Sequence, residues 1–211
     1  MTGSERLDDE LGAVRVRMDG MHQVREQALR HCRSMIQTSA KCIRHVHRRQ
    51  FREAADLLAE ARLTSAAARS EMEDYPELMY AGYLQDAEKE MVEAAVLLAW
   101  VGPDPWVGAD LASTVGPTSY LNGLGEAASE CRRYVLDEMR KGETAVAERL
   151  LGRMEAVYDD LITFDYPDAL TGGLRRTCDA LRAVVERTRS DLTMTTVQRE
   201  LLAELQAARE P

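Results

Sequence analysis

The sequence has few residues that interrupt or disfavour helices. Only six of its 211 residues are proline, and none of them comes before Pro76. Aromatic residues make up only 5% of the chain, whereas Ala, Leu, Glu and Arg are abundant. This mix favours helix over strand, because β-branched and aromatic residues are the ones enriched in strands. The composition therefore predicts an all-α protein.

Cysteines are also few, and their positions exclude two common kinds of site. Cys32, Cys42, Cys131 and Cys178 show no CxxC spacing and no paired histidines, which argues against a zinc site and against a disulfide framework. The longest apolar run, residues 94–101, is too short to cross a membrane. Residues 1–10 are polar and acidic, unlike a signal peptide. We therefore expect a cytoplasmic protein with no membrane partner.

Apolar residues recur at helical spacing, and breaks between the patterns are few. In the first pattern they include Leu29, Cys32, Ile36, Ala40 and Ile43. The longest break is a Gly- and Pro-rich loop over residues 101–118. We predict one bundle-like domain over residues 1–211, with residues 1–6 and 209–211 disordered. Its roughly seven helices are expected at residues 7–47, 50–72, 77–100, 119–140, 144–162, 173–189 and 193–208.

Two pairs of glutamates stand in unusually apolar surroundings. Glu90 and Glu93 are three residues apart on one helix face, and Glu93 is the only charge between Glu90 and Asp104. Glu126 and Glu130 are four residues apart, and no charged residue occurs in residues 111–125. A carboxylate on an apolar face is costly unless it is paired or binds a metal. If the pairs converge, oxygen ligands alone favour Mg²⁺ or Mn²⁺, which suit phosphodiester cleavage.

Glycines accompany the second pair. Gly123 and Gly125 each weaken a helix by up to about 1 kcal/mol relative to Ala. Their presence predicts that a neighbouring backbone or a ligand approaches closely. The alternative interpretation of both glutamate pairs is a solvated helix face or a set of salt bridges to arginine.

The formal net charge of −9 disfavours nucleic-acid binding unless basic residues gather on one surface. The first helix offers such a surface, because its cations fall at three- and four-residue steps, with Gln37 filling the gap between Arg33 and Lys41. The basic strip, as we call it, consists of Arg30, Arg33, Lys41, Arg44 and Arg48. It could follow a phosphate backbone, or it could pair with acidic residues of the second helix such as Glu53, Asp56 and Glu60.

Three separated motifs resemble the translin/TRAX family, and they occur in the family's order. Residues 90–94 (EMVEA) are similar to the TRAX motif EYVEA, and residues 120–130 (YLNGLGEAASE) resemble the glycine-containing acidic helix of TRAX proteins. Residues 164–176 (FDYPDALTGGLRR) look like the family's C-terminal segment. The likeness covers residues 7–193. One departure is Glu126, where TRAX proteins usually have Asp.

The resemblance implies a translin fold of about seven helices and a hollow octamer that encloses single-stranded nucleic acid. For a TRAX-like member it implies a Mg²⁺-dependent endoribonuclease acting on single-stranded RNA. By motif position, the catalytic and metal-binding residues would be Glu90, Glu93, Glu126 and Glu130. The basic strip would hold RNA, with single-stranded DNA a further partner.

Two other functions stay open at this point. The first is a non-catalytic, translin-like octamer that binds single-stranded RNA or DNA without cutting it. The second is a structural scaffold whose acidic clusters are merely salt-bridged, which would show little RNA binding.

Overall fold

A computed structural model describes residues 3–105 and 110–209 of the chain. In this part every regular element is a helix, which confirms the all-α prediction. Six helices are long and three are single turns. The long ones are α1 (Gly3–His47), α2 (Phe51–Glu71), α4 (Tyr83–Val101), α6 (Pro117–Lys141), α7 (Thr144–Leu161) and α9 (Leu174–Ala207). The single turns are α3 (Pro76–Met79), α5 (Leu111–Thr114) and α8 (Asp168–Thr171).

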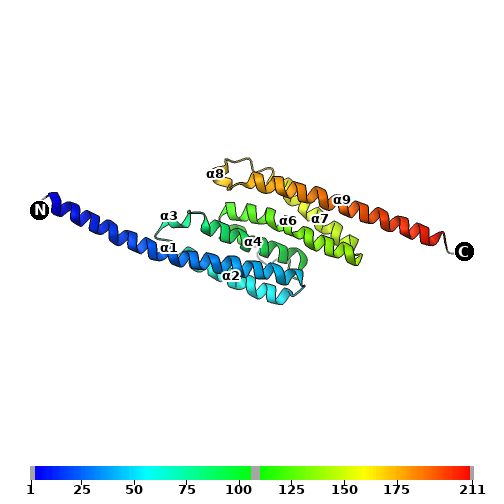
Figure 1. Ribbon diagram of the computed structural model, residues 1–211, viewed down its shortest axis with the longest axis horizontal. Helices are drawn as coiled ribbons and strands as arrows, with labels where there is room; N and C mark the ends of the chain where they lie inside the picture. Colours follow the sequence, from blue (N-terminus) through cyan, green and yellow to red (C-terminus); the bar gives the residue numbers. More distant parts are fainter. Residues whose placement is uncertain (1–2, 106–109, 210–211) are drawn as a thin grey trace.

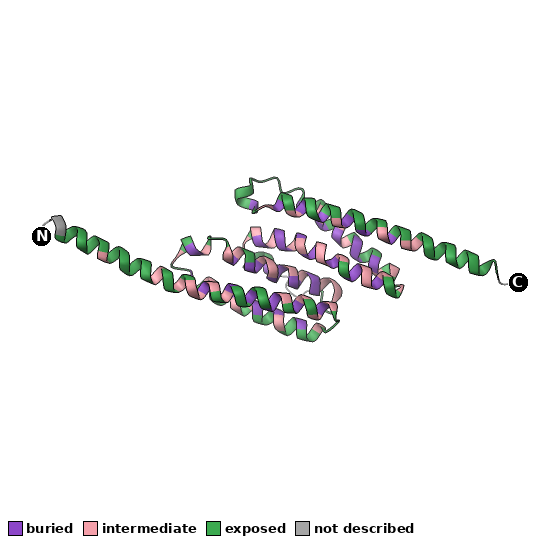
Figure 2. Ribbon diagram, viewed as in Figure 1, coloured by how far each residue is buried: buried purple, intermediate pink, exposed green. Residues whose placement is uncertain are grey.

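The helices run roughly along one long axis, with α4 and α6 side by side in the middle (Figure 1). On one side α4 packs against α1 and α2, and on the other α6 packs against α7 and α9. The α4–α6 contact therefore joins the two halves of the bundle. The buried residues lie in this central body, whereas the start of α1 and the end of α9 project from it and are mostly exposed (Figure 2).

Helix α1 shows why its buried face was predicted one residue off. Its most buried positions are spaced four and three residues apart, as a helix requires, and are Ala28, Cys32, Met35, Ser39, Cys42 and Val46. The predicted stripe instead included Ile36, whose exposed fraction is 38%. Apolar side chains stand on both sides of the true stripe, so the spacing alone did not fix its centre.

Three boundaries differ from the predicted ones for local reasons. The expected helix at residues 77–100 is interrupted before α4, because Gly82 takes a φ of 98°. The expected helices at residues 173–189 and 193–208 are one helix, α9, within which the Thr193 hydroxyl donates to the Arg189 carbonyl and does not cap a new helix. The predicted loop at residues 101–118 contains α5, and residues 106–109 lie outside the described residues.

Residues 3–6, expected to be disordered, form the first turn of α1, while residues 1–2 and 210–211 lie outside the described residues. Across the described chain, no helix is both long and apolar enough to cross a membrane.

Candidate metal centre and nucleic-acid interface

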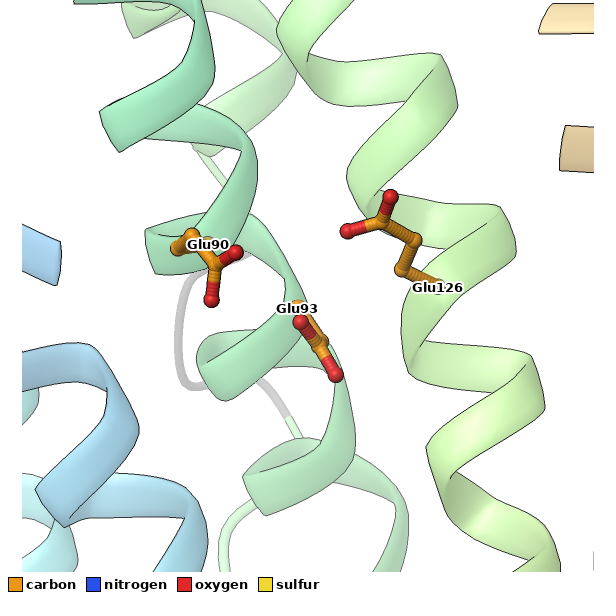
Figure 3. A group of neighbouring side chains, drawn as sticks. All are labelled: Glu90, Glu93 and Glu126. Carbon is orange, nitrogen blue, oxygen red and sulfur yellow. The ribbon is translucent and has the colours of Figure 1, made fainter.

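Three of the four predicted glutamates meet where α4 and α6 touch. Glu90 and Glu93 lie one turn apart on α4, and Glu126 comes from the facing side of α6 (Figure 3). One carboxylate oxygen from each residue lies within 4.8 Å of the other two. We call these three residues the carboxylate group. All three are partly buried, so the group is neither sealed in the core nor fully in solvent.

Gly123 allows the two helices to approach closely enough to form this group. A Cβ atom at this position would lie 2.6 Å from the backbone oxygen of Lys89 and 2.7 Å from the Cβ of Val92, both in α4. Gly125 is equally restricted, because a Cβ there would lie 2.6 Å from Thr177 in α9. The predicted close approach is therefore confirmed, and the neighbours are the backbone and side chains of adjacent helices.

The carboxylate group holds more negative charge than its surroundings compensate. Burial raises the pKa of Glu93 to about 8, and the charges of Glu90, Glu126 and Glu130 add to the rise. The pKa of Glu90 is also raised, mainly by burial and by the charge of Glu126. Such repulsion between neighbouring carboxylates is relieved by a proton or by a cation.

The donor set fits a hard divalent cation. All three groups offer oxygen, and no histidine nitrogen or cysteine sulfur belongs to the carboxylate group. Hard oxygen ligands are those that Mg²⁺ and Mn²⁺ prefer in proteins. Glu90, Glu93 and Glu126 are therefore the residues that could hold such an ion.

Lys89 already neutralises part of the charge. Its Nζ donates to Oε1 of Glu126 over 2.9 Å, and the pair is about two-thirds or more buried. Burial alone would lower the pKa of Lys89, but the hydrogen bond and the charge of Glu126 raise it overall. The ammonium group and a metal ion would thus compete for the same carboxylate.

Glu130, the fourth predicted residue, has a different partner. It lies one turn beyond Glu126 on α6, and its Oε1 accepts a hydrogen bond from Nε2 of His47 over 2.6 Å. The His47 side chain is only 4% exposed, so this contact fixes Glu130 from α1. The structure therefore places Glu130 beside the carboxylate group, close enough to raise the pKa of Glu93, but not within it.

The predicted basic strip lies along the exposed side of α1. All five of its cations, Arg30, Arg33, Lys41, Arg44 and Arg48, are exposed. Within residues 3–105 and 110–209 none of them forms an ion pair, so the alternative pairing with Glu53, Asp56 and Glu60 is not seen. Arg44 stands three residues before His47 and hence on the same side of α1. The strip therefore leads toward the histidine that holds Glu130.

Sequence reasoning missed two residues of this site. Lys89 sits in an acidic stretch that drew attention to its neighbours, and its carboxylate partner is 37 positions away. His47 was not among the predicted site residues, and its partner, Glu130, is 83 positions away. The apolar residue Val46 beside it was the one signal that this part of α1 faces the core.

Some known proteins are similar to this chain in sequence, and some solved structures are similar to it in fold. No protein-family model matches the chain. A protein from Methanocaldococcus jannaschii described as uncharacterized is 29% identical over 190 residues, which cover 87% of this chain and 82% of that protein. Solved structures of C3PO proteins extend the likeness to three dimensions.

The crystal structure of AfC3PO, an archaeal C3PO, superposes with a TM-score of 0.82 at 33% identity, covering 90% of this chain and 98% of that one. AfC3PO in complex with duplex RNA matches over the same shares at a TM-score of 0.80 and 31% identity. Apo-NeC3PO, at 19% identity and a TM-score of 0.71 over 92% of this chain and 98% of that one, shares the fold. The chain belongs to the translin/TRAX family, as its three motifs indicated.

Proposed function

We propose that the protein is a Mg²⁺-dependent endoribonuclease that cuts single-stranded RNA inside a hollow homo-oligomer, an octamer. The observation that carries this proposal is the convergence of Glu90, Glu93 and Glu126 within 4.8 Å, at carboxylates whose repulsion a cation would relieve. A Mg²⁺ ion held there would polarise the phosphodiester and promote attack by water. Glu130, fixed by His47, would orient that water.

The basic strip supplies the sequence-independent part of RNA binding in this proposal. Five exposed cations without carboxylate partners can neutralise phosphates along a strand. The strip ends one residue after His47, which contacts Glu130, and we propose that a strand lying on the strip continues toward the carboxylate group. The solved complex of AfC3PO contains duplex RNA, so duplex RNA is the natural competitor to single-stranded RNA in any assay.

The projecting helix ends favour assembly. Exposed apolar residues recur every three or four positions near the start of α1, and they are Leu7, Leu11, Val14 and Met18. A similar row stands near the end of α9, with Met194, Val197, Leu201 and Leu205. Contiguous exposed apolar surface of this kind marks contacts with other chains. Sedimentation velocity gives the number of subunits directly, and a monomer would contradict this part of the proposal.

The test of activity compares end-labelled single-stranded and duplex RNA, each with Mg²⁺ and with EDTA. We expect internal cuts in single-stranded RNA that require Mg²⁺. Glu126→Ala should reduce the rate by more than about 100-fold, because losing even a hydrogen-bonding partner of a metal ligand costs about 10–100-fold. Glu148→Ala, at an exposed glutamate of α7, should cut at the wild-type rate. Activity that survives in Glu126→Ala would contradict the assigned site.

A second function, binding without cleavage, is favoured by one observation. Lys89 already occupies Glu126, so the ammonium group could replace the metal permanently. This function predicts tight RNA binding in EDTA and no products at any Mg²⁺ concentration.

A further inference from the structure

A cavity of about 300 Å³ opens beside the carboxylate group and shares Glu126 with it. Its walls come from α4, α6, the turn between α8 and α9, and the start of α9. The charged residues among its lining are Asp86, Lys89, Glu126 and Arg176. This volume is at the small end of the range for ligand sites, about 300–1,000 Å³, which suits one unit of a polymer better than a whole cofactor.

The neutral polar groups of the cavity are already used to build its wall. Asn122 is 4% exposed, donates to the backbone oxygens of Thr118 and Thr171, and accepts from the Thr177 hydroxyl. Gly172 has a φ of 56°, and a Cβ there would lie 2.5 Å from the Cγ2 of Thr118. These contacts hold the α8–α9 turn tightly against α6.

This arrangement leaves two cations to meet a ligand. Arg176 lines the cavity from the start of α9, three residues after Gly173. Its side chain is exposed and has no ion-pair partner among the described residues. Lys89 reaches the cavity from α4, and among the described residues its ammonium group donates a hydrogen bond to Glu126. An unpartnered guanidinium lining a cavity matches the geometry of a phosphate group.

Glu126 links the cavity to the carboxylate group. A carboxylate that coordinates a divalent cation is a weaker partner for an ammonium group, because the ion has taken up its charge. A cation at the carboxylate group would thus release Lys89 into the cavity. With Glu126 neutralised by the cation, the charged groups left in the cavity would be Lys89, Arg176 and Asp86. The net charge of its lining would then be positive.

We propose that Lys89 and Arg176 form a subsite for an RNA backbone phosphate next to the phosphodiester that is cut, and that metal binding at Glu126 makes Lys89 available to it. The subsite rests on the proposed function, since it places the substrate of the same centre. It makes Lys89 and Arg176 substrate-positioning residues, and it couples metal binding to RNA binding.

The test uses Lys89→Met, Lys89→Arg and Arg176→Met, with Arg175→Met as the matched control. Arg175 is the preceding, equally exposed arginine of α9, and it lines a different cavity. For each full-length variant, Mn²⁺ affinity is measured without RNA, and KM, kcat and the salt dependence of RNA binding are measured with Mn²⁺ present. Circular dichroism verifies that each variant is folded.

We expect Arg176→Met to bind Mn²⁺ as the wild type does, with KM raised about 10-fold and the salt slope reduced by about 1. Lys89→Met should bind Mn²⁺ more tightly, because a competitor for Glu126 is gone, and yet bind RNA about 10-fold more weakly. Lys89→Arg should restore much of the RNA affinity, and Arg175→Met should change none of these quantities.

Two results would overturn the subsite. One is Arg176→Met with a wild-type KM and salt slope, and the other is Lys89→Met that gains metal affinity and cuts RNA faster in proportion. If the wild type itself cuts no RNA, the proposed function fails, but the comparison of RNA binding with Mn²⁺ still decides the subsite. Weaker RNA binding by Lys89→Met and Arg176→Met, but not by Arg175→Met, would support the subsite. Equal RNA affinity in all four variants would refute it.

Discussion

Replacing Glu93 by glutamine measures how strongly the carboxylate group destabilises the metal-free protein. Burial and three neighbouring carboxylates raise the pKa of Glu93 from its ordinary 4.5 to about 8. Between these values the folded protein holds a proton that the unfolded chain has lost. Because the folded pKa is the higher one, stability falls as pH rises from about 4.5 to 8, and the loss is complete above pH 8.

The size of the effect follows from the same two values. At about 1.4 kcal/mol per tenfold change, a rise from 4.5 to about 8 corresponds to about 5 kcal/mol. Water reaches the site, since Glu93 is only partly buried, so we expect about 2–4 kcal/mol to be realised. Glutamine keeps the shape and removes the charge. Glu93→Gln should therefore unfold about 5–10 °C higher than the wild type at pH 9, and at the same temperature near pH 4.5.

The assay is thermal unfolding in EDTA from pH 4.5 to 9, at one protein concentration because association also shifts Tm. Glu148→Gln, at the exposed glutamate of α7, should leave the pH dependence unchanged. Mg²⁺ at pH 8 should raise the Tm of the wild type more than that of Glu93→Gln, because only the wild type has the full charge to bind it. Parallel Tm curves for wild type and Glu93→Gln across this pH range would refute the reasoning.

Two further predictions concern the packing that supports the site. Gly123→Ala should lower stability by about 1–3 kcal/mol and weaken Mn²⁺ binding, because its Cβ would meet the α4 backbone at 2.6 Å, whereas Gly152→Ala, with open space around the new Cβ, should raise stability by about 0.5–1 kcal/mol. Chemical denaturation compares the two. Arg69→Met should cost about 3–5 kcal/mol, because it removes the cation paired with the fully buried Glu88 and leaves the Ser65 hydroxyl as its hydrogen-bond donor, and adding Glu88→Gln should recover part of that loss. If the stability losses of Arg69→Met and Glu88→Gln simply add in the double variant, the prediction for this buried ion pair is contradicted.

The helical architecture could be predicted from the sequence because its signals are local. The absence of proline before Pro76 and the three-to-four spacing of apolar residues depend only on near neighbours. The break before α4 was missed, since a single glycine, Gly82, decides it through a positive φ. The continuity of α9 was missed because Thr193, which resembles a helix start, instead donates back to the preceding turn.

The carboxylate group was predictable in part for a similar reason. Glutamates in apolar stretches and the glycine at position 123 are visible in the sequence, and the structure brings Glu90, Glu93 and Glu126 together. Glu130 is separated from the other three glutamates because it contacts His47, and Glu126 contacts Lys89. Both contacts join residues that are far apart in the sequence. They depend on how α1 and α4 face α6, and no spacing rule within one helix gives that geometry.

Glu126 is the position where the chain departs from the aspartate usual in TRAX proteins, and the structure gives the longer side chain a physical role. Its carboxylate reaches both the oxygens of Glu90 and Glu93 and the Nζ of Lys89. An aspartate at the same place on α6 would end one methylene nearer its own helix, and so farther from the α4 side chains that it must reach. The longer glutamate side chain thus lets the carboxylate of Glu126 lie near those of Glu90 and Glu93 and also line the neighbouring cavity. In the subsite that we propose, a cation at Glu126 would weaken its pairing with Lys89, and the extra methylene would then couple metal binding to the cavity beside it.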